Sequence, residues 1–257
     1  MTSFIQFNNN LAKRKPNTLK NKQITCPFCA QETLRKENGI LDETTNVLWI
    51  KNKFPTFQDA FQTVLVEHHE CDHNLSTYPK EHLYRLMDFV LTKWLDMEKD
   101  STYASVVLMK NQGIQSGASI HHSHMQIIGF HNIDYKKNIS SDDFAGTSII
   151  EGDVSLTLST FPKSEMYEFN LSFPDVYSTK QLHTCSDLLQ GTIRYVLTEL
   201  NAKHQSFNLM FYHIEDKINI KIVPRFPSSA FLLGYNLHQV PVYTEEIIST
   251  LKTNYLP

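Results

Sequence analysis

The sequence is poor in glycine, with only eight among its 257 residues. None of these glycines forms the glycine-rich loop of a P-loop or of a dinucleotide-binding fold, so bound phosphate would have to be held by other means. The sequence also lacks an apolar run long enough to cross a membrane, and its N-terminus lacks the apolar core of a secretory signal. We therefore expect a cytoplasmic protein with no membrane partner.

An excess of positive charge is also missing. Twenty-four Lys and Arg residues stand against 27 Asp and Glu residues, which gives a formal net charge of −3. Such a chain has no general attraction for nucleic acid, so we expect no nucleic-acid partner. The basic run KRKP at 13–16 is interpreted as part of a solvated arm that covers residues 1–25. The apolar fraction of 41% is typical of a globular protein with a substantial core.

Cysteines are few and unevenly spaced. In a reducing compartment this usage favours metal ligands or buried thiols over disulfides. Cys26 and Cys29 form a C-x-x-C pair, which is half of a common tetrahedral zinc site. The segment EHHECDHN at 67–74 and the histidines at 121–124 are the natural donors of the missing ligands. Other residues are expected to have no such role: Cys185 as a buried apolar residue, and His68, His69, His73 and His82 as surface residues.

Hydrophobic patterning predicts an α+β fold. Apolar residues recur every three to four positions from Leu83 to Leu95, which predicts an amphipathic helix. A second helix is predicted at 184–203. Because a helix followed by two strands occurs twice, we expect two related halves, residues 1–134 and 135–257, joined within 131–165. The predicted strands are 46–54, 61–70, 103–113, 119–130, 165–174, 206–214 and 218–226.

The segment SIHHSHMQ at 119–126 concentrates polar residues in a predicted strand. Alternate side chains of a strand share a face, so His122, His124 and Gln126 would point one way and His121 the other. A metallohydrolase would place a carboxylate close behind such an H-x-H pair, where this segment has Gln126. Taken alone, the pattern leaves metal, ligand and solvent open as partners of these groups.

Together these motifs resemble the galactose-1-phosphate uridylyltransferase branch of the histidine-triad superfamily. That family's strand reads Gly-Cys-Ser-Asn-Pro-His-Pro-His-Gly-Gln. Segments CPFC at 26–29, NKFP at 52–55 and NQG at 111–113 match three further family motifs. The similarity is clear in the first half and faint in the second, and it implies a histidine-triad antiparallel sheet with packed helices, the second half being degenerate. The strand motif matches without a gap at Gly117, Ser119, His122, His124 and Gln126.

The resemblance implies a nucleotidyltransferase or phosphorylase. His124 would take a nucleoside monophosphate, UMP or AMP, from a nucleotide sugar and pass it to a sugar phosphate or phosphate. Ser119 and Gln126 would bind phosphoryl oxygens, and Asn52, Asn111 and Gly117 would complete the nucleotide and phosphate contacts. A nucleotide hydrolase and a zinc-stabilised nucleotide-binding protein without turnover are the alternatives. The expected partners are the donor, the acceptor and, in a homodimer, a second copy.

The resemblance also implies a structural zinc ion held by Cys26, Cys29 and His122. Its fourth ligand departs from the family. A gap-free alignment of VEHHECDHNL with the family's Val-Glu-Ser/Thr-Pro-Asp-His places Cys71 at the ligand position, whereas a two-residue slip would use His73. We prefer Cys71, because the register then holds on both sides and thiolate is a good zinc ligand.

The second half departs further from the family. Asn219 and Lys221 replace the histidines of its second His-x-His strand, so no second metal site is expected. Asn236 replaces a glutamate that contacts the hexose, which argues against galactose specificity. Lys221 and Arg225 could serve an anionic acceptor or could lie at a solvated strand end.

Overall fold

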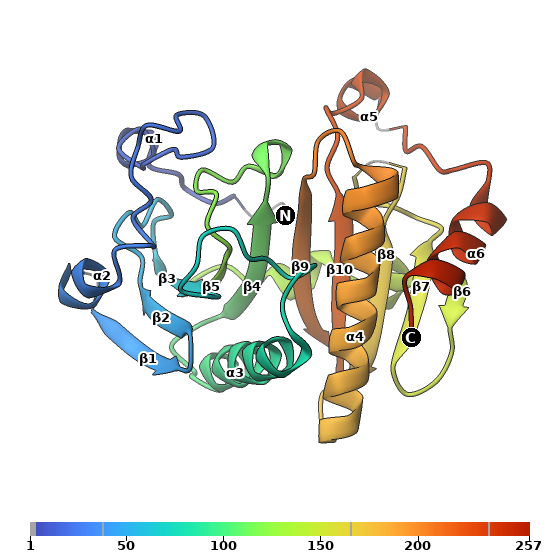
Figure 1. Ribbon diagram of the computed structural model, residues 1–257, viewed down its shortest axis with the longest axis horizontal. Helices are drawn as coiled ribbons and strands as arrows, with labels where there is room; N and C mark the ends of the chain where they lie inside the picture. The colour runs from blue at the N-terminus through green and yellow to red at the C-terminus, as the bar shows by residue number, and fades with distance from the viewer. Residues whose placement is uncertain (1–3, 38, 165, 236) are drawn as a thin grey trace.

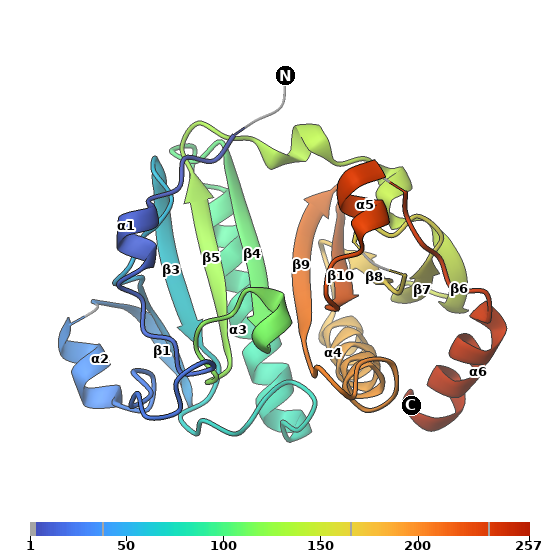
Figure 2. The same cartoon turned by 90° about the horizontal axis from the view of Figure 1, so that it is seen from above.

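A computed structural model describes residues 4–37, 39–164, 166–235 and 237–257. In these residues one antiparallel sheet of ten strands runs through the whole chain, in the order β1-β2-β3-β5-β4-β9-β10-β8-β7-β6 (Figures 1 and 2). The first half holds β1 (Ile40–Thr44), β2 (Val47–Lys51), β3 (Ala60–Val66), α3 (Lys80–Glu98), β4 (Ser105–Gln112) and β5 (His124–Phe130). The second holds β6 (Gly146–Ile150), β7 (Ser155–Ser159), β8 (Phe169–Pro174), α4 (Thr179–Tyr195), β9 (Phe207–Ile214) and β10 (Lys217–Pro224).

The two halves repeat one topology. Read from its outer edge inward, the first half has the order β1-β2-β3-β5-β4 and the second β6-β7-β8-β10-β9, so that β4 and β9 pair at the centre. Figure 1 shows the first half on the left and the second on the right. The predicted α+β fold with two related halves is confirmed. The boundary at 134/135 falls between β5 and β6 and stays a prediction, because the sheet is continuous across both halves.

Helices α3 and α4 pack against each other and against one face of the sheet. The predicted apolar stripe of α3 is buried, and Trp94 Nε1 donates to the Val106 carbonyl at 3.0 Å. Ser178 begins α4 with a capping box to Gln181, and a π-helical turn, Val196–Leu200, follows the helix. Cys185 is fully buried in this core, as expected.

The opposite face of the first half carries a second, smaller core. There α2 (Gln31–Glu37) and the segment before it pack on β2 and β3. Figure 2 shows α2 and α1 (Asn9–Ala12) beside the β1–β3 edge. The other short elements are η1 (Ile114–Ser116), η2 (Tyr135–Asn138), η3 (Ser141–Phe144), α5 (Ala230–Tyr235) and α6 (Thr244–Asn254). No described helix combines the length and apolar character needed to span a bilayer.

Several predicted boundaries are wrong. The strand predicted at 46–54 ends at Lys51, and the helix predicted at 184–203 is observed at Thr179–Tyr195. Three further differences concern strands. The strand expected from residue 119 begins only at His124, because the preceding residues pair with the N-terminal segment instead of a strand: the His121 N–H donates to Thr18 Oγ1 at 2.8 Å. Strand β3 ends at Val66, so residues 67–74 form a loop. Strand β8 begins at Phe169, and the predicted first residue of that strand, Glu165, lies outside the described residues.

His213 lies near the C-terminal end of β9 and connects this strand to α3 and to the residue that follows β8. Its Nδ1 is 2.6 Å from Glu98 Oε2 at the end of α3, and its Nε2 is 3.1 Å from Asp175 Oδ2 after β8. Because carboxylates only accept hydrogen bonds, both ring nitrogens donate and the imidazole is cationic. The hydrogen bond to Glu98 is the main cause that raises the pKa of His213 above its usual 6.5, against desolvation.

We expect His213→Asn to lower the free energy of unfolding by about 1.5–3 kcal/mol at about pH 6, the size of a hydrogen bond to a charged group. A raised folded-state pKa gives stability that is fully present below the unfolded value of 6.5 and is lost as the pH rises through the folded value. The deficit should therefore shrink by about pH 9. Urea denaturation of both proteins at the two pH values measures it, and an equal deficit at both would contradict the prediction.

Candidate active site and metal centre

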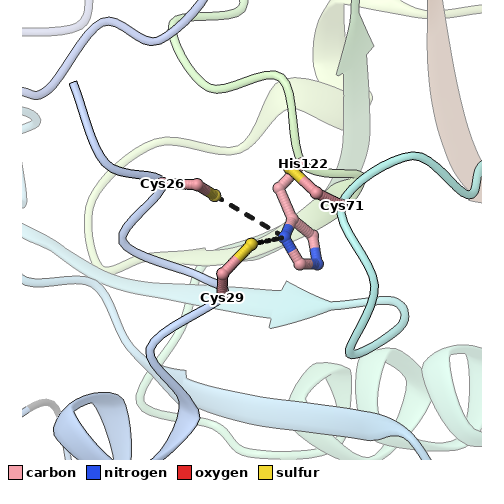
Figure 3. Close-up of side chains that lie close together, drawn as sticks. All are labelled: Cys26, Cys29, Cys71 and His122. Carbon is pink, nitrogen blue, oxygen red and sulfur yellow. Dashed lines mark hydrogen bonds between the residues drawn. The ribbon is translucent and has the colours of Figure 1, made fainter. Parts of the chain in front are cut away.

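Four potential metal ligands from three separate segments converge beside the sheet (Figure 3). Cys26 and Cys29 come from the segment before α2, Cys71 from the loop after β3, and His122 from the residues leading into β5. One ligand atom from each lies within 4.8 Å of all the others. The Sγ atoms of Cys26 and Cys29 are 3.6 and 3.5 Å from His122 Nδ1. Three thiols and one imidazole at this spacing fit a tetrahedral metal ion.

The His122 ring is fixed so that one nitrogen remains free for a metal. Its Nε2 lies 2.7 Å from the carbonyl oxygen of His68. A carbonyl can only accept, so Nε2 carries the hydrogen and Nδ1 presents its lone pair to the thiols. The ring is fully buried. This buried His122 does not lie in the strand, so the expected shared strand face holds for His124 and Gln126 only.

His73, the alternative fourth ligand, lies outside this cluster. Its Nε2 is 2.6 Å from Glu70 Oε2, and its ring packs on His68. His69 and His73 are at least partly exposed, as expected, but the surface assignment of His68 and His82 is wrong. Both are buried, and His82 Nε2 donates to the Glu67 carbonyl at 2.9 Å. Burial lowers the pKa of His68 to about 4 and also lowers the pKa of His82.

A cavity of about 410 Å³ opens on the face of the first half opposite α3. This volume lies within the range of about 300–1,000 Å³ that is typical of small-molecule sites. The cavity brings together the six residues that the sequence assigned to nucleotide chemistry, from the end of β2, from β4, from the loop before β5 and from β5 itself. They are Asn52, Asn111, Gly117, Ser119, His124 and Gln126.

The His124 ring presents the opposite tautomer to that of His122. Its Nδ1 lies 2.8 Å from the carbonyl oxygen of His122, so Nδ1 carries the hydrogen and Nε2 keeps a lone pair. Burial lowers the pKa of His124 to about 4, and the imidazole is neutral at neutral pH. Phe28 packs edge-on against the ring at 5.1 Å between centroids, which connects the Cys26–Cys29 segment to His124. A neutral imidazole of this kind can act as a nucleophile.

The N-terminal segment forms one wall of this cavity, so the solvated-arm interpretation is wrong for its described part. Lys15 and Pro16 line the cavity, and Lys15 Nζ lies 3.3 Å from Thr56 Oγ1. Phe7 pairs with Phe57 across an isolated β-bridge, and their rings are 5.8 Å apart. The KRKP run is the one sequence signal that could have indicated a basic group at an anionic site. The described structure thus adds a cation and an aromatic wall to the predicted residues.

Two of the residues considered for the second half, Lys221 and Asn219, lie away from the cavity. Lys221 is buried and pairs with Glu168 and with Asn170 Oδ1, the latter at 2.8 Å, so it does not reach the cavity. Asn219 is also buried and pairs with Ser172. Asn236 lies outside the described residues.

Residues 7–133 match the domain of unknown function DUF4931, N-terminal domain, and residues 136–256 match its C-terminal domain. A crystal structure of a DUF4931 family protein from Bacillus cereus ATCC 10987 is 38% identical, with a TM-score of 0.74 over 83% of this chain and 97% of that chain. The chain belongs to the DUF4931 family. No curated protein matches its sequence.

More distant structures share the fold of this DUF4931 protein. A galT-like protein from Arabidopsis thaliana is 16% identical, with a TM-score of 0.71 over 98% of this chain and 99% of that chain. An ADP-glucose phosphorylase from the same plant, with bound ADP-glucose, is 16% identical, with a TM-score of 0.70 over 94% and 93%. A uridylyltransferase is 14% identical, with a TM-score of 0.66 over 90% and 91%. The resemblance to the galactose-1-phosphate uridylyltransferase branch is confirmed as a likeness of fold.

A buried ion pair lies behind the cavity of the DUF4931 protein, on the helix side of the sheet. Lys110 on β4 and Glu67 after β3 have fully buried side chains, and Lys110 Nζ is 2.5 Å from Glu67 Oε1. The same Nζ lies 3.5 Å from the His124 carbonyl oxygen, and Tyr78 donates to Glu67 Oε2 at 3.2 Å. The pair therefore ties together β3, β4 and the start of β5, where His124 lies. Sequence patterning did not identify this pair.

Loss of Cys71 should remove the metal, and loss of His73 should not. Loss of a direct ligand should cost at least as much as loss of an outer-shell partner, which weakens metal affinity by about 10–100-fold. We therefore expect Cys71→Ser to lose most of its bound metal and to melt at a lower temperature, and His73→Ala to keep both. Plasma mass spectrometry and thermal melts measure these properties. Full metal retention in Cys71→Ser would overturn the assignment.

Lys110→Met should lower the free energy of unfolding by about 3–5 kcal/mol, because it leaves the Glu67 charge buried without its partner. Replacing both residues, as in Lys110→Met with Glu67→Gln, should cost less than the single change, since no uncompensated charge remains. Chemical denaturation of the single and double variants measures the coupling. A double variant as unstable as the sum of its two singles would show that the residues do not interact.

Proposed function

We propose that this DUF4931 protein is a nucleotidyltransferase or phosphorylase of the galactose-1-phosphate uridylyltransferase type. It transfers a nucleoside monophosphate, UMP or AMP, from a nucleotide sugar to a sugar phosphate or to phosphate. The observation that carries the proposal is the neutral, backbone-anchored His124 in a cavity of nucleotide size. The ADP-glucose bound to the phosphorylase of the same fold also supports a nucleotide sugar as the donor.

The transfer proceeds in two steps through His124. In the first, the Nε2 lone pair attacks the α-phosphorus of the donor, and the bond from that phosphorus to the leaving oxygen breaks. The leaving sugar phosphate takes the electron pair of that bond. In the second, an oxygen of the acceptor phosphate attacks the same phosphorus, and the pair of the phosphorus–nitrogen bond returns to the imidazole. One difficult transfer is thus divided into two easier displacements.

The other cavity residues have separate roles in this scheme. Ser119 and Gln126 donate hydrogen bonds to the phosphoryl oxygens as charge shifts in each displacement. Lys15 supplies positive charge, and burial lowers the pKa of its ammonium group. The aromatic wall near Asn52 accommodates the flat base of the nucleoside, since aromatic side chains and bases stack on each other. The Nδ1 hydrogen bond holds His124 in the reactive tautomer throughout.

The metal in this proposal is a structural zinc ion held by Cys26, Cys29, Cys71 and His122. Three thiolates and one imidazole are a preferred zinc donor set, and four protein ligands leave no open position for substrate. The chemistry that the ion supplies is therefore cross-linking of three segments. Phe28, which lies between the ligands Cys26 and Cys29, connects the metal site to the cavity because its ring packs on both His122 and His124.

Incubation with a panel of nucleotide sugars and dinucleotides should leave an acid-labile nucleotidyl group on His124, detectable by mass spectrometry. His124→Asn should form no adduct. His121→Asn, which changes an exposed histidine three residues earlier, should form it normally. Gln126→Ala should slow adduct formation by about 10²–10³-fold, the cost of removing one donor to a developing charge.

The fate of the adduct separates the proposed transferase from its alternatives. Release by phosphate or a sugar phosphate supports transfer, whereas release by water alone would indicate a hydrolase. Saturable nucleotide binding with no adduct from any donor would indicate a binding protein and would refute the proposal.

A further inference from the structure

We infer that Arg225, from the second half of the chain, forms a subsite for the phosphate group of the acceptor at the edge of the His124 cavity. The inference rests on the proposed function for the role of the phosphate, but the anion site itself stands on separate observations. Arg225 directly follows β10, and neither the cavity wall nor the buried Lys221 pair includes it.

Arg225 lies on the same face of the sheet as the cavity. In β4 and β9, Asn111 pairs with Asn208, and in β9 and β10, Asn208 pairs with Val223. Paired residues of antiparallel strands share a face, and so does a residue two positions further on, which places Arg225 on that face. The side chains are also connected: Asn208 Nδ2 donates to Asn111 Oδ1 at 2.6 Å, and Arg225 Nη1 donates to Asn208 Oδ1 at 3.3 Å. Because Asn111 lines the cavity, Arg225 lies one side chain beyond its wall.

Among the described residues, no carboxylate pairs with the guanidinium of Arg225. Its Nε is buried and has no hydrogen-bond partner, and no carboxylate of the described residues lies within 4.0 Å of its nitrogens. Arg225 as a whole is half-buried, whereas the fully buried cations Lys110 and Lys221 each pair with a glutamate. A buried donor without a partner calls for a ligand or solvent to satisfy it. An anion with two or more acceptor oxygens suits the planar fork of arginine.

The backbone holds Arg225 in place before any ligand binds. Its N–H donates to the Ser206 carbonyl at 2.8 Å, and its own carbonyl accepts from Asn201 Nδ2 at 2.9 Å. Asn201 is itself almost completely buried. These contacts fix the main chain at Arg225, and the Nη1 hydrogen bond to Asn208 orients its side chain. A partly preorganised cation loses less conformational freedom when it binds a ligand.

The same part of the second half also holds the loop that leads to Ser119. Asn208 Nδ2 donates to the Ser116 carbonyl at 3.0 Å, and the Gln115 N–H donates to Ser206 Oγ at 3.2 Å. Gly113 has a φ of +81°, and a Cβ there would lie 2.4 Å from Ser206 Oγ, so only glycine fits this approach. The loop and Arg225 are therefore positioned by one shared set of contacts.

The order of the strands indicates how a bound substrate would be oriented across the sheet. The aromatic wall and Asn52 lie on the β2–β3 side of His124, whereas Asn111, Asn208 and Arg225 lie on the β4–β9–β10 side. With the nucleoside on the first side and the α-phosphorus at His124, the leaving or accepting group extends toward Arg225. The ligand class is a phosphate dianion, either inorganic phosphate or the phosphate of a sugar 1-phosphate.

Binding of inorganic phosphate and of glucose 1-phosphate, measured by calorimetry on the full chain, tests the anion site directly. We expect Arg225→Gln to weaken binding by about 10–100-fold, the loss of a charge-assisted hydrogen bond. Arg225→Lys should weaken it less, because the charge remains but the fork is lost. Lys217→Ala, which removes an exposed charge from the far end of the same strand, should bind as the unchanged protein does. Phosphate binding equal in Arg225→Gln and the unchanged protein, or absent from the unchanged protein, would overturn the inference.

The two half-reactions then test the role of the subsite. With Arg225→Gln, adduct formation on His124 should slow, because the leaving sugar phosphate occupies the subsite in the first displacement. Release of the adduct by the acceptor should slow as well, and the acceptor concentration that gives half the maximal rate should rise. Release is measured with inorganic phosphate and with glucose 1-phosphate. The acceptor whose release rate falls more in Arg225→Gln is the one whose phosphate the subsite binds. Slowed adduct formation with unchanged release would overturn the assignment to the acceptor. Arginine-dependent phosphate binding without any adduct would leave the anion site standing and refute nucleotidyl transfer.

Discussion

Two backbone carbonyls determine what the His-x-His pair can do. The carbonyl of His68 takes the Nε2 hydrogen of His122, and the carbonyl of His122 takes the Nδ1 hydrogen of His124. Two imidazoles separated by one residue are thereby fixed in opposite tautomers, one with Nδ1 free for a metal and the other with Nε2 free. The identity of the side chains cannot produce this difference. It depends on where the strand starts. Because β5 begins only at His124, His122 lies outside the sheet and points to the loop after β3.

The repeated topology of the sheet does not lead to two equivalent sites. In the second half, the polar residues of β8 and β10 are buried and satisfied by one another: Lys221 contacts Glu168 and Asn170, and its Nζ lies 5.2 Å from the centre of the Phe144 ring. A nucleotide could not replace those contacts without leaving buried charges unpaired, which is costly. The second half instead supports the first through the β4–β9 pair and the contacts of Asn208. One half keeps the cavity, and the other holds its loop in place.

Motif spacing predicted the parts of the site whose residues are close in sequence. The Cys26–Cys29 pair and the register from Gly117 to Gln126 need only local geometry and a family pattern, and the structure brings those residues to one metal cluster and one cavity. What could not be predicted depends on distant contacts. The wall formed by Lys15, the lead-in held by Thr18, and the Glu67–Lys110 pair join positions 41 to 103 residues apart. Periodicity reports burial of an element's face, and it carries no information about which distant polar groups will meet there.

The metal cluster and the cavity are mechanically one unit, although no ligand of the metal lines the cavity. The potential ligands come from three segments, and closing the loops between them has an entropic cost that metal binding would offset. Phe28 lies between two of these ligands, is almost fully buried, and forms part of the cavity wall while touching both histidines. A metal ion held by these ligands would fix this ring together with the lead-in to β5, and so both contacts that orient His124. In the proposed function, a metal ion bound by this cluster would therefore act on His124 through Phe28 and the lead-in to β5, without lining the cavity.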